Sequence, residues 1–569
     1  MRVERGEALS RYIESEPLPE FSPRTRARNI ERLKGELFDI LVIGGGITGA
    51  GIARDAVLRG FRTALIEKGD YASGTSSRSS RLIHGGLRYL ENWEFHLVFE
   101  ACAERRRLRR IAPHLVKPLP FILPVYQDSA LPYWEIRLGM WLYDLLALFR
   151  NIKLHRALKP REILRLEPAI SPQGLVGGAR FYDCSVDDAR LTLATIQSAH
   201  RYGAVAVNHA QVYGFIQEGG RICGVRVHDA LTGQRFEVRA RVVVSATGPW
   251  TDQIAAMDDP RAEGRLRLTK GIHLVVPRHR IGNRNAVAFV SPRDRRLMFL
   301  IPWGDYAIIG TTDTDYEGDL ERVHAEAEDV EYVLEAFNTA FPKVGLTTAD
   351  ILSTYAGVRP LIDEKVPSAY KVSREHRIFK SPSGLLSIAG GKLTTYRLMA
   401  KQMVDLAARR LAREFDRVGW GRSKTGRLPL EGGVREGFHV VAAQAREAAR
   451  AHGLPEDVVS HLLTAYGVGY ARVLGLIEAD EALAEPIVEG LPYIWAELPH
   501  AIQVEMALTL DDFLVRRTHI IYEAEDQGVS RAGEVAERMA PLLGWGPREV
   551  ERQVERYAEQ VALTRMYEG

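Results

Sequence analysis

The sequence predicts a mixed α/β protein in three parts: a parallel-sheet domain built from separated segments, a domain with a mixed or antiparallel sheet, and a C-terminal helical domain. Residues 38–60 read as strand, glycine turn and helix, and residues 240–248 as a second buried strand that ends at glycine. Beyond residue 433, helical periodicity dominates. Because 569 residues exceed what one hydrophobic core accommodates, several domains are expected.

The composition excludes few classes of protein. Hydrophobic residues at 46% and charged residues at 26% are ordinary for a globular chain, and the net charge of +3 argues neither for nor against a polyanionic partner. Cys102, Cys184 and Cys223 have no C-x-x-C spacing, which supports neither disulfides nor zinc and fits a reducing, cytoplasmic location. No apolar run is long enough for a membrane span. Residues 1–35 lack a secretory signal, and we expect them to pack loosely on the first domain.

The first strand leads into a glycine-rich turn. Phe38 to Ile43 reads as a buried strand, and Gly44, Gly46 and Gly49 then complete G-x-G-x-x-G before a helix. A second strand ends at Glu67, 21 residues beyond Gly46. This βαβ order is typical of a Rossmann-like dinucleotide site, where glycines let the backbone approach a pyrophosphate at the helix N-terminus. A carboxylate at Glu67 suits both ribose hydroxyls and disfavours a 2′-phosphate, which leaves NAD and FAD as alternatives.

Three later segments are suited to complete such a site. Residues 71–80 form a loop of small or hydroxylated residues, Arg78 excepted, which suits a polar ligand. The strand before Gly248 would return to the first sheet and bring Ala246, Thr247 and Gly248 beside the nucleotide, so the nucleotide domain is expected to be discontinuous. Residues 385–397 again read as strand, glycine turn and helix, a second place where helix amides can face a ligand.

Other elements follow from periodicity. Strands are expected at residues 178–182, 211–215, 224–227, 266–276, 286–290, 297–301 and 306–310. Helices are expected at residues 91–111, 187–202, 325–341, 434–452, 455–466, 470–480, 502–514 and 547–566. Residues 131–149 are apolar but interrupted by Glu135, Arg137 and Asp144, which favours a largely buried amphipathic helix over a membrane-surface element. The arginines of residues 105–110 are expected to form a solvated helix face.

Seven strings occur in order along the chain, at residues 44–51 (GGGITGAG), 82–90 (LIHGGLRYL), 246–250 (ATGPW), 309–313 (IGTTD), 357–361 (GVRPL), 390–397 (GGKLTTYR) and 510–514 (LDDFL). In these strings the chain resembles the FAD-dependent sn-glycerol-3-phosphate dehydrogenases, within the D-amino-acid-oxidase-like flavoenzyme superfamily. The resemblance implies interleaved FAD-binding and substrate domains at residues 36–425 and a helical domain at residues 426–569. The chain departs from the family in residues 1–35 and at Arg81, where lysine is common.

The resemblance decides between the two dinucleotides, because it implies FAD, bound non-covalently. It implies no metal. It implies adenosine at Glu67, the pyrophosphate at the first glycine turn, and the flavin across residues 76–81 and 391–394, with His84 close to the ring. The implied cofactor-binding residues are Gly44, Gly45, Gly46, Ile47, Thr48, Gly49, Glu67, Lys68, Thr75, Ser76, Ser77, Ser80, Arg81, His84, Gly85, Ala246, Thr247, Gly248, Gly391, Lys392, Leu393 and Thr394.

The implied reaction oxidises sn-glycerol 3-phosphate to dihydroxyacetone phosphate by hydride transfer to flavin N5, with a quinone at the membrane surface as acceptor. The implied substrate group is Arg88, Tyr89, His273, Arg359 and Lys392. Guanidinium forks and an ammonium suit phosphate oxygens. His273 titrates nearest neutrality and is one candidate for the general base, while Arg359 is the alternative group, stabilising the developing alkoxide. The expected protein is a homo-oligomer at the inner face of the cell membrane, without a nucleic-acid partner.

Two alternatives stay open. A related oxidase would reduce oxygen directly, and the strings around the flavin do not separate it from a quinone-linked dehydrogenase. A flavin-binding but inactive module is disfavoured by Arg88, Arg359 and Lys392, which nucleotide binding alone would not require. The string at residues 505–517 is assigned a structural role, with core contacts from Met506, Leu510, Phe513 and Leu514.

Overall fold

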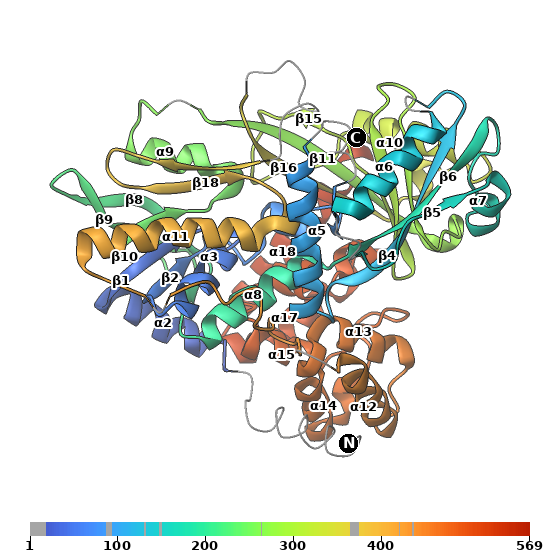
Figure 1. Ribbon diagram of the computed structural model, residues 1–569. Coiled ribbons are helices and arrows are strands. Elements are labelled where there is room, and N and C mark those ends of the chain that lie inside the picture. Colours follow the sequence, from blue (N-terminus) through green and yellow to red (C-terminus); the bar gives the residue numbers. More distant parts are fainter. Residues whose placement is uncertain are drawn as a thin grey trace, which may run out of the picture.

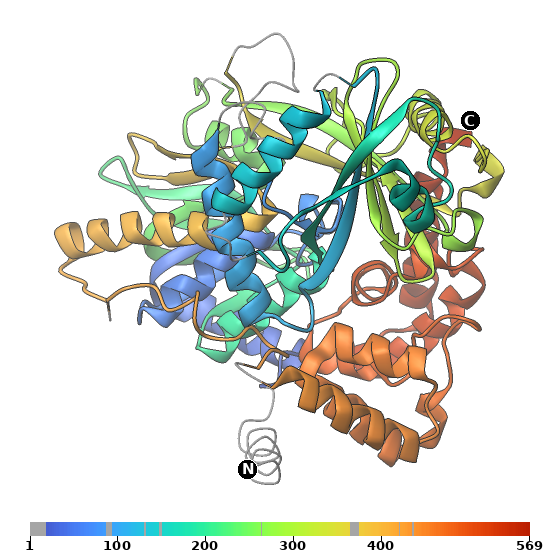
Figure 2. The same ribbon diagram turned by 45° about the vertical axis from the view of Figure 1, so that its right-hand side comes forward.

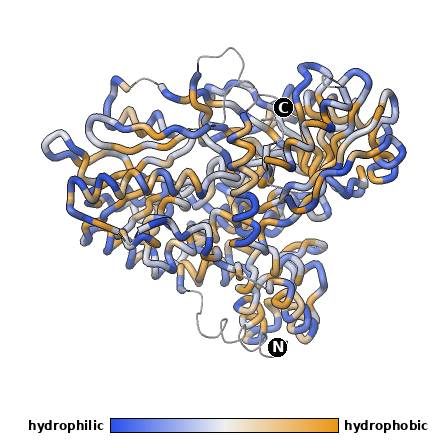
Figure 3. Tube along the Cα trace, viewed as in Figure 1, coloured by the Kyte–Doolittle hydropathy of each residue, from blue (hydrophilic) through white to orange (hydrophobic). Residues whose placement is uncertain are grey.

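The computed structural model describes residues 19–86, 94–129, 132–146, 151–262, 264–364, 375–419, 421–434 and 437–568. Two sheets occupy the upper part of the molecule, and a bundle of helices from the C-terminal third lies below them (Figure 1). A turned view shows the same separation of the bundle from the sheets (Figure 2). Apolar residues follow the strands of both sheets (Figure 3). This arrangement confirms the mixed α/β fold with a C-terminal helical part.

The first sheet is parallel at its centre, with strand order β17-β18-β10-β1-β2-β7. β8 and β9 extend it as an antiparallel ribbon joined to β10. Its strands are β1 (Leu37–Ile43), β2 (Thr63–Ile66), β7 (Val205–Val207), β8 (Ala210–Glu218), β9 (Arg221–Asp229), β10 (Arg235–Ser245), β17 (His376–Lys380) and β18 (Leu386–Gly390). Because β10 pairs in parallel with β1, the domain is discontinuous, as the sequence predicted.

Helices cover both faces of this sheet. One face carries α3 (Ile47–Leu58), α8 (Asp188–Arg201) and α11 (Tyr396–Phe415). On the other face, α2 (Pro23–Gly35) buries Leu33 in the same cluster as Leu41. Arg26 of this helix forms a buried ion pair with Asp229 at 2.6 Å. The expectation of a loosely packed N-terminal extension is therefore wrong for its described part.

The second sheet has strand order β15-β11-β14-β13-β12-β4-β6-β3, with β16 on β11 and β5 on β6. Its strands are β3 (Leu82–Ile83), β4 (Lys117–Tyr126), β5 (Arg156–Leu158), β6 (Leu175–Ser185), β11 (Leu266–Pro277), β12 (Ala286–Val290), β13 (Leu297–Trp303), β14 (Tyr306–Gly310), β15 (Thr314–Asp315) and β16 (Ser353–Ile362). α7 (Pro160–Leu166) and α10 (Ala327–Ala340) pack on one face. α6 (Tyr133–Leu146) packs on the opposite face. This sheet is mixed, as the sequence predicted.

The remaining helices connect the sheets or form the C-terminal part. They are α5 (Phe95–Ile111), α9 (Thr251–Asp258), α12 (Phe438–Ala451), α13 (Glu456–Tyr466), α14 (Tyr470–Ala479), α15 (Glu497–Val504), α16 (Ile520–Glu523), α17 (Val529–Leu543) and α18 (Pro547–Thr564). Short 3₁₀ turns are η1 (Thr75–Ser77), η2 (Gly248–Trp250), η3 (Arg278–Arg280), η4 (Thr348–Asp350), η6 (Leu393–Thr395), η7 (Gly467–Gly469), η8 (Glu481–Ala484) and η10 (Met566–Glu568). α12, α13 and α14 enclose a core of their own.

The helix expected at residues 502–514 is wrong. α15 ends at Val504, Met506 adopts a left-handed φ of 52°, and a π-helical turn, η9 (Asp512–Arg517), follows. The left-handed residue breaks the helix, although the apolar spacing continues. The four predicted core contacts are all buried, which agrees with a structural role: Met506, Leu510, Phe513 and Leu514.

α6 buries Met140 and Tyr143 on one face but leaves most of its large apolar side chains exposed, so the expected largely buried helix is wrong. Four large side chains are 65%, 64%, 55% and 52% exposed, respectively: Trp134, Leu138, Trp141 and Leu145. The physical reason lies on the inner side of the helix, where Asp144 accepts hydrogen bonds from Asn151 at 2.6 Å and His155 at 2.7 Å. Within the described part of the chain, no helix has both the length and the apolar character needed to cross a membrane.

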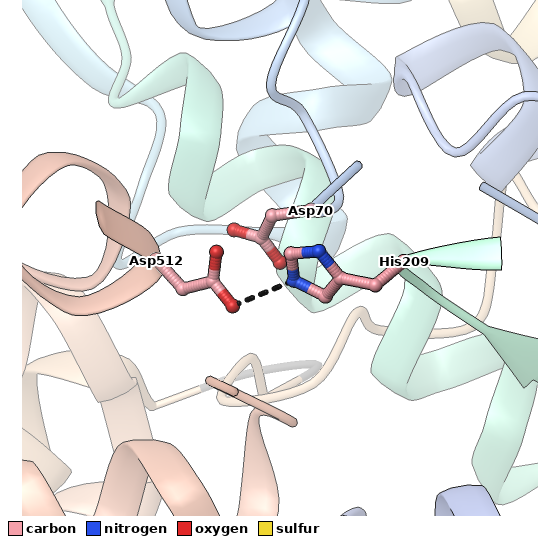
Figure 4. Close-up of side chains that lie close together, drawn as sticks. All are labelled: Asp70, His209 and Asp512. Carbon is pink, nitrogen blue, oxygen red and sulfur yellow. Dashed lines mark hydrogen bonds and ion pairs between the residues drawn. The ribbon is translucent and has the colours of Figure 1, made fainter. Parts of the chain in front are cut away.

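A buried ionic cluster joins the C-terminal part to the first sheet. Asp70 accepts hydrogen bonds from Arg516 at 2.5 Å and from Arg517 at 2.5 and 3.0 Å. Asp512 accepts from Arg516 and from His209, each at 2.9 Å, and the contact with His209 is drawn in Figure 4. Asp70, His209 and Asp512 have the donor types of a metal site. The two arginines already balance the two carboxylates, so the cluster is complete as an ionic network.

Arg517→Ala should lower the free energy of unfolding by about 3–5 kcal/mol, because it leaves a buried charge on Asp70 only partly compensated. The measurement is the thermal-unfolding midpoint of the purified protein. Arg531→Ala is the matched control: its ion pair with Glu534 is exposed, so the change should stay below about 1 kcal/mol. Similar midpoints for the two variants would contradict the role given to the cluster.

Candidate active site

A cavity of about 370 Å³ is lined by residues from both sheets. Small-molecule sites in proteins span roughly 300–1,000 Å³, so this volume suits a ligand. One wall consists of residues that follow the carboxyl ends of β1, β2, β10 and β18. This is the edge at which parallel α/β sheets bind ligands. The opposite wall comes from β11, β13 and β16 of the second sheet.

The turn between β1 and α3 has no room for side chains. Gly44 has a φ of +106°, and a Cβ there would lie 2.6 Å from the carbonyl oxygen of Ala246. A Cβ at Gly49 would lie 1.9 Å from the carbonyl oxygen of Gly44. The first helical residue, Ile47, donates its N–H to Ser76 Oγ at 2.9 Å. The turn is therefore a close backbone cradle at the helix N-terminus, which favours an anionic ligand group.

Glu67 directly follows β2, and its carboxylate accepts a hydrogen bond from the glycine turn. Its Oε2 accepts the N–H of Gly45 at 2.6 Å, and its Oε1 accepts the N–H of Gly69 at 2.8 Å. Burial raises the pKa of Glu67, and these two hydrogen bonds act in the opposite direction. A carboxylate can accept about four hydrogen bonds, so acceptor sites remain for ligand hydroxyls.

The opposite wall is a strand pair whose register opposes two glycines. β11 and β16 pair Gly271 with Gly357. A Cβ at Gly271 would lie 2.2 Å from Nη2 of Arg359, and one at Gly357 would lie 2.9 Å from the carbonyl oxygen of Arg78. Because Gly271 lacks a side chain, the Arg359 guanidinium packs over the β11 backbone at this position, while Gly357 makes room for Arg78. The Arg359 guanidinium donates to Thr311 Oγ1 at 2.8 Å.

His273 lies on the same strand pair, opposite Tyr355. The two rings stack with centroids 4.7 Å apart, and His273 Nε2 lies 2.9 Å from Ser80 Oγ. Its Nδ1 is buried and makes no hydrogen bond within the described residues. Burial, together with the charges of Arg359 and Arg81, lowers the pKa of His273 to about 3. The imidazole is therefore neutral at physiological pH, the state that can accept a proton.

The turn after β18 completes the cavity. Gly390 and Gly391 have φ values of 75° and 88°, conformations that other residues rarely adopt. Lys392 follows them and lines the cavity. Two residues on, the Thr394 hydroxyl hydrogen-bonds the backbone N–H and carbonyl of His84, each at 3.2 Å. The β18 turn and the segment after β3 are thus held together.

Most of the predicted site residues line this cavity. They are Gly44, Gly46, Ile47, Thr48, Glu67, Lys68, Thr75, Ser76, Ser80, His84, Ala246, Thr247, Gly248, His273, Arg359, Gly391, Lys392 and Leu393. Gly45, Gly49, Ser77, Gly85 and Thr394 lie outside the lining. Arg81 is also outside it, because its guanidinium lies 3.9 Å above the Trp303 ring and within 3.3 Å of His519. Arg88 and Tyr89 fall outside the described residues.

Sequence reasoning missed other lining residues, among them Arg78, Trp250 and Phe299. Arg78 was visible as the single cation of its loop, and Trp250 belongs to one of the seven strings. Phe299 had no signal, because it lies within an ordinary apolar strand. Four cationic side chains line the cavity, namely Lys68, Arg78, Arg359 and Lys392, against one carboxylate in the described lining, Glu67. Two carboxylates outside the lining partly balance them, because Lys68 pairs with Glu321 and Arg359 with Asp313. The cations still outnumber these carboxylates, which favours an anionic ligand.

Comparisons with known proteins agree with this geometry. A family model described as "FAD dependent oxidoreductase" matches residues 39–406, and one described as "C-terminal domain of alpha-glycerophosphate oxidase" matches residues 423–550. A glycerol-3-phosphate dehydrogenase of Mycobacterium leprae is 42% identical, covering 96% of this chain and 92% of the relative. An aerobic glycerol-3-phosphate dehydrogenase of Staphylococcus haemolyticus is 37% identical, covering 90% and 92%. The structure of glycerol-3-phosphate dehydrogenase from Bacillus halodurans complexed with FAD is 34% identical, with a TM-score of 0.79, covering 96% of this chain and 98% of that chain.

His273→Asn should reduce the acid sensitivity of the fold. Unfolded histidine takes up a proton below a pH of about 6.5, whereas the folded pKa is about 3, so wild-type stability falls as pH drops through this window. The contribution reaches about 1.4 kcal/mol per pH unit. The drop in thermal midpoint between about pH 7 and pH 5 should be smaller in the variant than in wild type. His279→Asn, at an exposed position, should follow wild type, and equal drops in all three proteins would refute the buried neutral histidine.

Proposed function

The chain belongs to the FAD-dependent oxidoreductases, in the glycerol-3-phosphate dehydrogenase family, and from this premise we propose its reaction. It oxidises sn-glycerol 3-phosphate to dihydroxyacetone phosphate and passes the electrons to a quinone at the membrane surface. One observation carries the proposal: Arg359 and His273 face the same cavity as the glycine cradle and Glu67. Substrate groups and cofactor groups thereby meet in one cationic space.

The residues present fit FAD. The backbone at Gly44 and Gly49 excludes any side chain, which leaves the helix N-terminus open to a pyrophosphate. Glu67 keeps acceptor sites for ribose hydroxyls, and the β18 turn with Lys392 supplies the far wall. When bound, FAD supplies the hydride acceptor at flavin N5. We also propose that the other predicted cofactor residues contribute to the FAD site, including those that do not line the cavity.

In this proposal the cationic side chains of the cavity bind the substrate phosphate. Lys392 offers a compact charge and Arg359 a planar fork, the two geometries that proteins use for phosphate oxygens. Arg78 adds charge that sequence reasoning did not assign. Arg88 and Tyr89 remain proposed substrate residues by resemblance, although they lie outside the described residues. The cationic set also argues against an inactive FAD module.

In this proposal His273 accepts the proton of the substrate hydroxyl, and Arg359 lies beside it. The buried imidazole is neutral because its pKa is about 3, so it is in the proton-accepting form. So low a pKa makes it a weak base, and proton transfer then needs the alkoxide to be stabilised as it forms. The guanidinium of Arg359 provides that charge, so both groups take part in our proposal.

The quinone acceptor is supported by the exposed apolar side of α6, which suits a membrane surface better than water. Direct reduction of oxygen remains the second candidate, supported by the match of residues 423–550 to the C-terminal domain of alpha-glycerophosphate oxidase. The proposal also includes assembly as a homo-oligomer at the inner face of the membrane. It places the boundary of the C-terminal helical domain near residue 425.

Anaerobic mixing with glycerol 3-phosphate should bleach the flavin absorbance of the FAD-loaded protein, because substrate hydride is then the sole source of reduction. Admission of a soluble quinone should restore the absorbance faster than air does. Faster reoxidation by air, with stoichiometric peroxide, would favour the oxidase. Absence of bleaching would remove the proposed reaction.

Lys392→Ala should raise KM for glycerol 3-phosphate about ten- to hundred-fold while FAD stays bound, because one charged hydrogen-bond donor to phosphate is lost. Lys380→Ala, at an exposed position on β17, is the matched control and should behave as wild type.

Glu67→Ala should instead weaken FAD binding, so that the purified variant retains little FAD. A fully flavinated Glu67→Ala protein, or unchanged KM in Lys392→Ala, would overturn the corresponding assignment.

A further inference from the structure

The imidazole of His273 meets the cavity through a serine hydroxyl. Its Nδ1 is buried and makes no hydrogen bond within the described residues, so a ligand in the cavity does not reach this nitrogen. Its Nε2 lies 2.9 Å from Ser80 Oγ, and both residues line the cavity. Because a ring nitrogen takes part in one hydrogen bond, the Ser80 hydroxyl occupies the position from which a substrate would otherwise contact the imidazole.

Tyr355 fixes the imidazole and the serine segment relative to each other. Its ring stacks on His273, with centroids 4.7 Å apart and an interplanar angle of 16°. Its hydroxyl donates to the backbone carbonyl of Ser79 at 3.0 Å. One buried, rigid side chain therefore contacts both the imidazole and the residue before Ser80, which limits changes in the distance between Ser80 and His273.

A buried carboxylate holds Ser79 as well. Asp188, the first residue of α8, accepts the Ser79 backbone N–H at 3.0 Å and the Ser79 hydroxyl at 2.7 Å, both at Oδ2. Its Oδ1 accepts the backbone N–H of Ala189 at 3.0 Å. Burial raises the pKa of Asp188 to about 6, although the charge of Arg81 and the hydrogen bonds from Ser79 lower it. The carboxylate is therefore mostly ionised at neutral pH, and hydrogen bonds to an ionised group are stronger than those between neutral groups.

The residue after Ser80 is also held in place. Arg81 has a left-handed φ of 53°, a conformation that residues other than glycine rarely adopt. Its backbone N–H donates to Ser79 Oγ at 3.0 Å, and its guanidinium lies 3.9 Å above the Trp303 ring. Such conformations persist only where the surrounding structure imposes them, and they are common at functional sites. Because both neighbours of Ser80 are fixed, its hydroxyl stays within reach of His273.

We propose that Ser80 is a catalytic residue that relays the proton of the substrate hydroxyl to His273, and that Asp188 is a positioning residue for Ser80. The C2 hydroxyl passes its proton to Ser80 Oγ as the Ser80 proton moves to His273 Nε2, and the C2 hydrogen leaves with its electron pair for the bound flavin. A carbonyl forms at C2, Ser80 regains its proton, and His273 becomes an imidazolium. The neutral imidazole starts with its proton on Nδ1, since the other tautomer would place the lone pair on the enclosed nitrogen. The proposal rests on the role of His273 in the proposed function.

The test measures flavin reduction when the FAD-loaded protein is mixed anaerobically with glycerol 3-phosphate. Ser80→Ala should lower the limiting rate about 10²- to 10⁴-fold, the usual contribution of a proton-transfer group. Ser80→Thr keeps a hydroxyl and should recover most of that rate. FAD content and the dissociation constant of dihydroxyacetone phosphate should stay as in wild type, because the hydroxyl moves a proton and does not hold the phosphate.

Three results would overturn the relay. The first is an equal rate of flavin reduction in Ser80→Ala and wild type, and the second is an equal rate in Ser80→Ala and Ser80→Thr. The third is a loss of FAD, or of affinity for dihydroxyacetone phosphate, large enough to account for the slower rate of Ser80→Ala. Absence of flavin reduction in wild type would instead refute the proposed reaction, so the two failures are distinguishable.

The role of Asp188 is tested by combining variants. Asp188→Asn should slow flavin reduction about ten- to hundred-fold, because small displacements of catalytic groups are costly. Since Asp188 acts through Ser80, the double variant with Ser80→Ala should be no slower than Ser80→Ala alone, and additive losses would overturn the positioning role. The matched control is Glu167→Gln, a buried carboxylate outside the cavity lining that accepts the Asn285 backbone N–H at 2.7 Å, and it should reduce flavin as wild type does.

Discussion

The constraint on which the site depends is the buried ionic cluster of Asp70, His209, Asp512, Arg516 and Arg517. Asp70 lies three residues after Glu67, and the backbone N–H of His209 binds the carbonyl of Gly69 at 2.8 Å. The turn that carries Glu67 is therefore clamped between the first sheet and the C-terminal part. Separating these charges would leave buried ions uncompensated, a change that costs several kcal/mol. The C-terminal helices thus position the cofactor wall without lining it.

The wall contributed by β11 and β16 depends on an absence of side chains as well as on charge pairing, because Arg359 forms an ion pair with Asp313 at 3.2 Å. Gly271 on β11 leaves room for the Arg359 guanidinium, and two residues further along the strand His273 stacks on Tyr355 of β16. Burial lowers the pKa of His273 first, and the charges of Arg359 and Arg81 lower it further, since adjacent positive charges repel in a site of low dielectric. The same packing that holds Arg359 over β11 therefore helps to keep His273 neutral.

The glycine turn of the cofactor wall could be predicted from the sequence because it depends on residues close together in the chain. Features that depend on packing between distant segments could not be predicted in this way. The cradle at Gly44 and Gly49 follows from steric rules that act within a few residues, so its strand, turn and helix were found. β4 was missed because Pro118, Pro120 and Pro124 argue against a central strand, although it pairs with β6 along its length. For α6, periodicity revealed an apolar face but not whether that face meets the core or the outside. Arg81 directly precedes the string at residues 82–90, yet its guanidinium lies over the Trp303 ring and outside the cavity lining.

The same helices connect the outer surface to the cavity. Arg105 of α5 binds Tyr143 of α6 and pairs with Asp183, whose carboxylate accepts the N–H of Gly85 at 3.0 Å, next to His84 in the cavity lining. α5 and α6 are therefore joined to the segment at His84 through the buried carboxylate of Asp183. A change that breaks the contacts of Arg105 would leave this carboxylate only partly compensated, so a substitution outside the cavity would disturb the cavity wall.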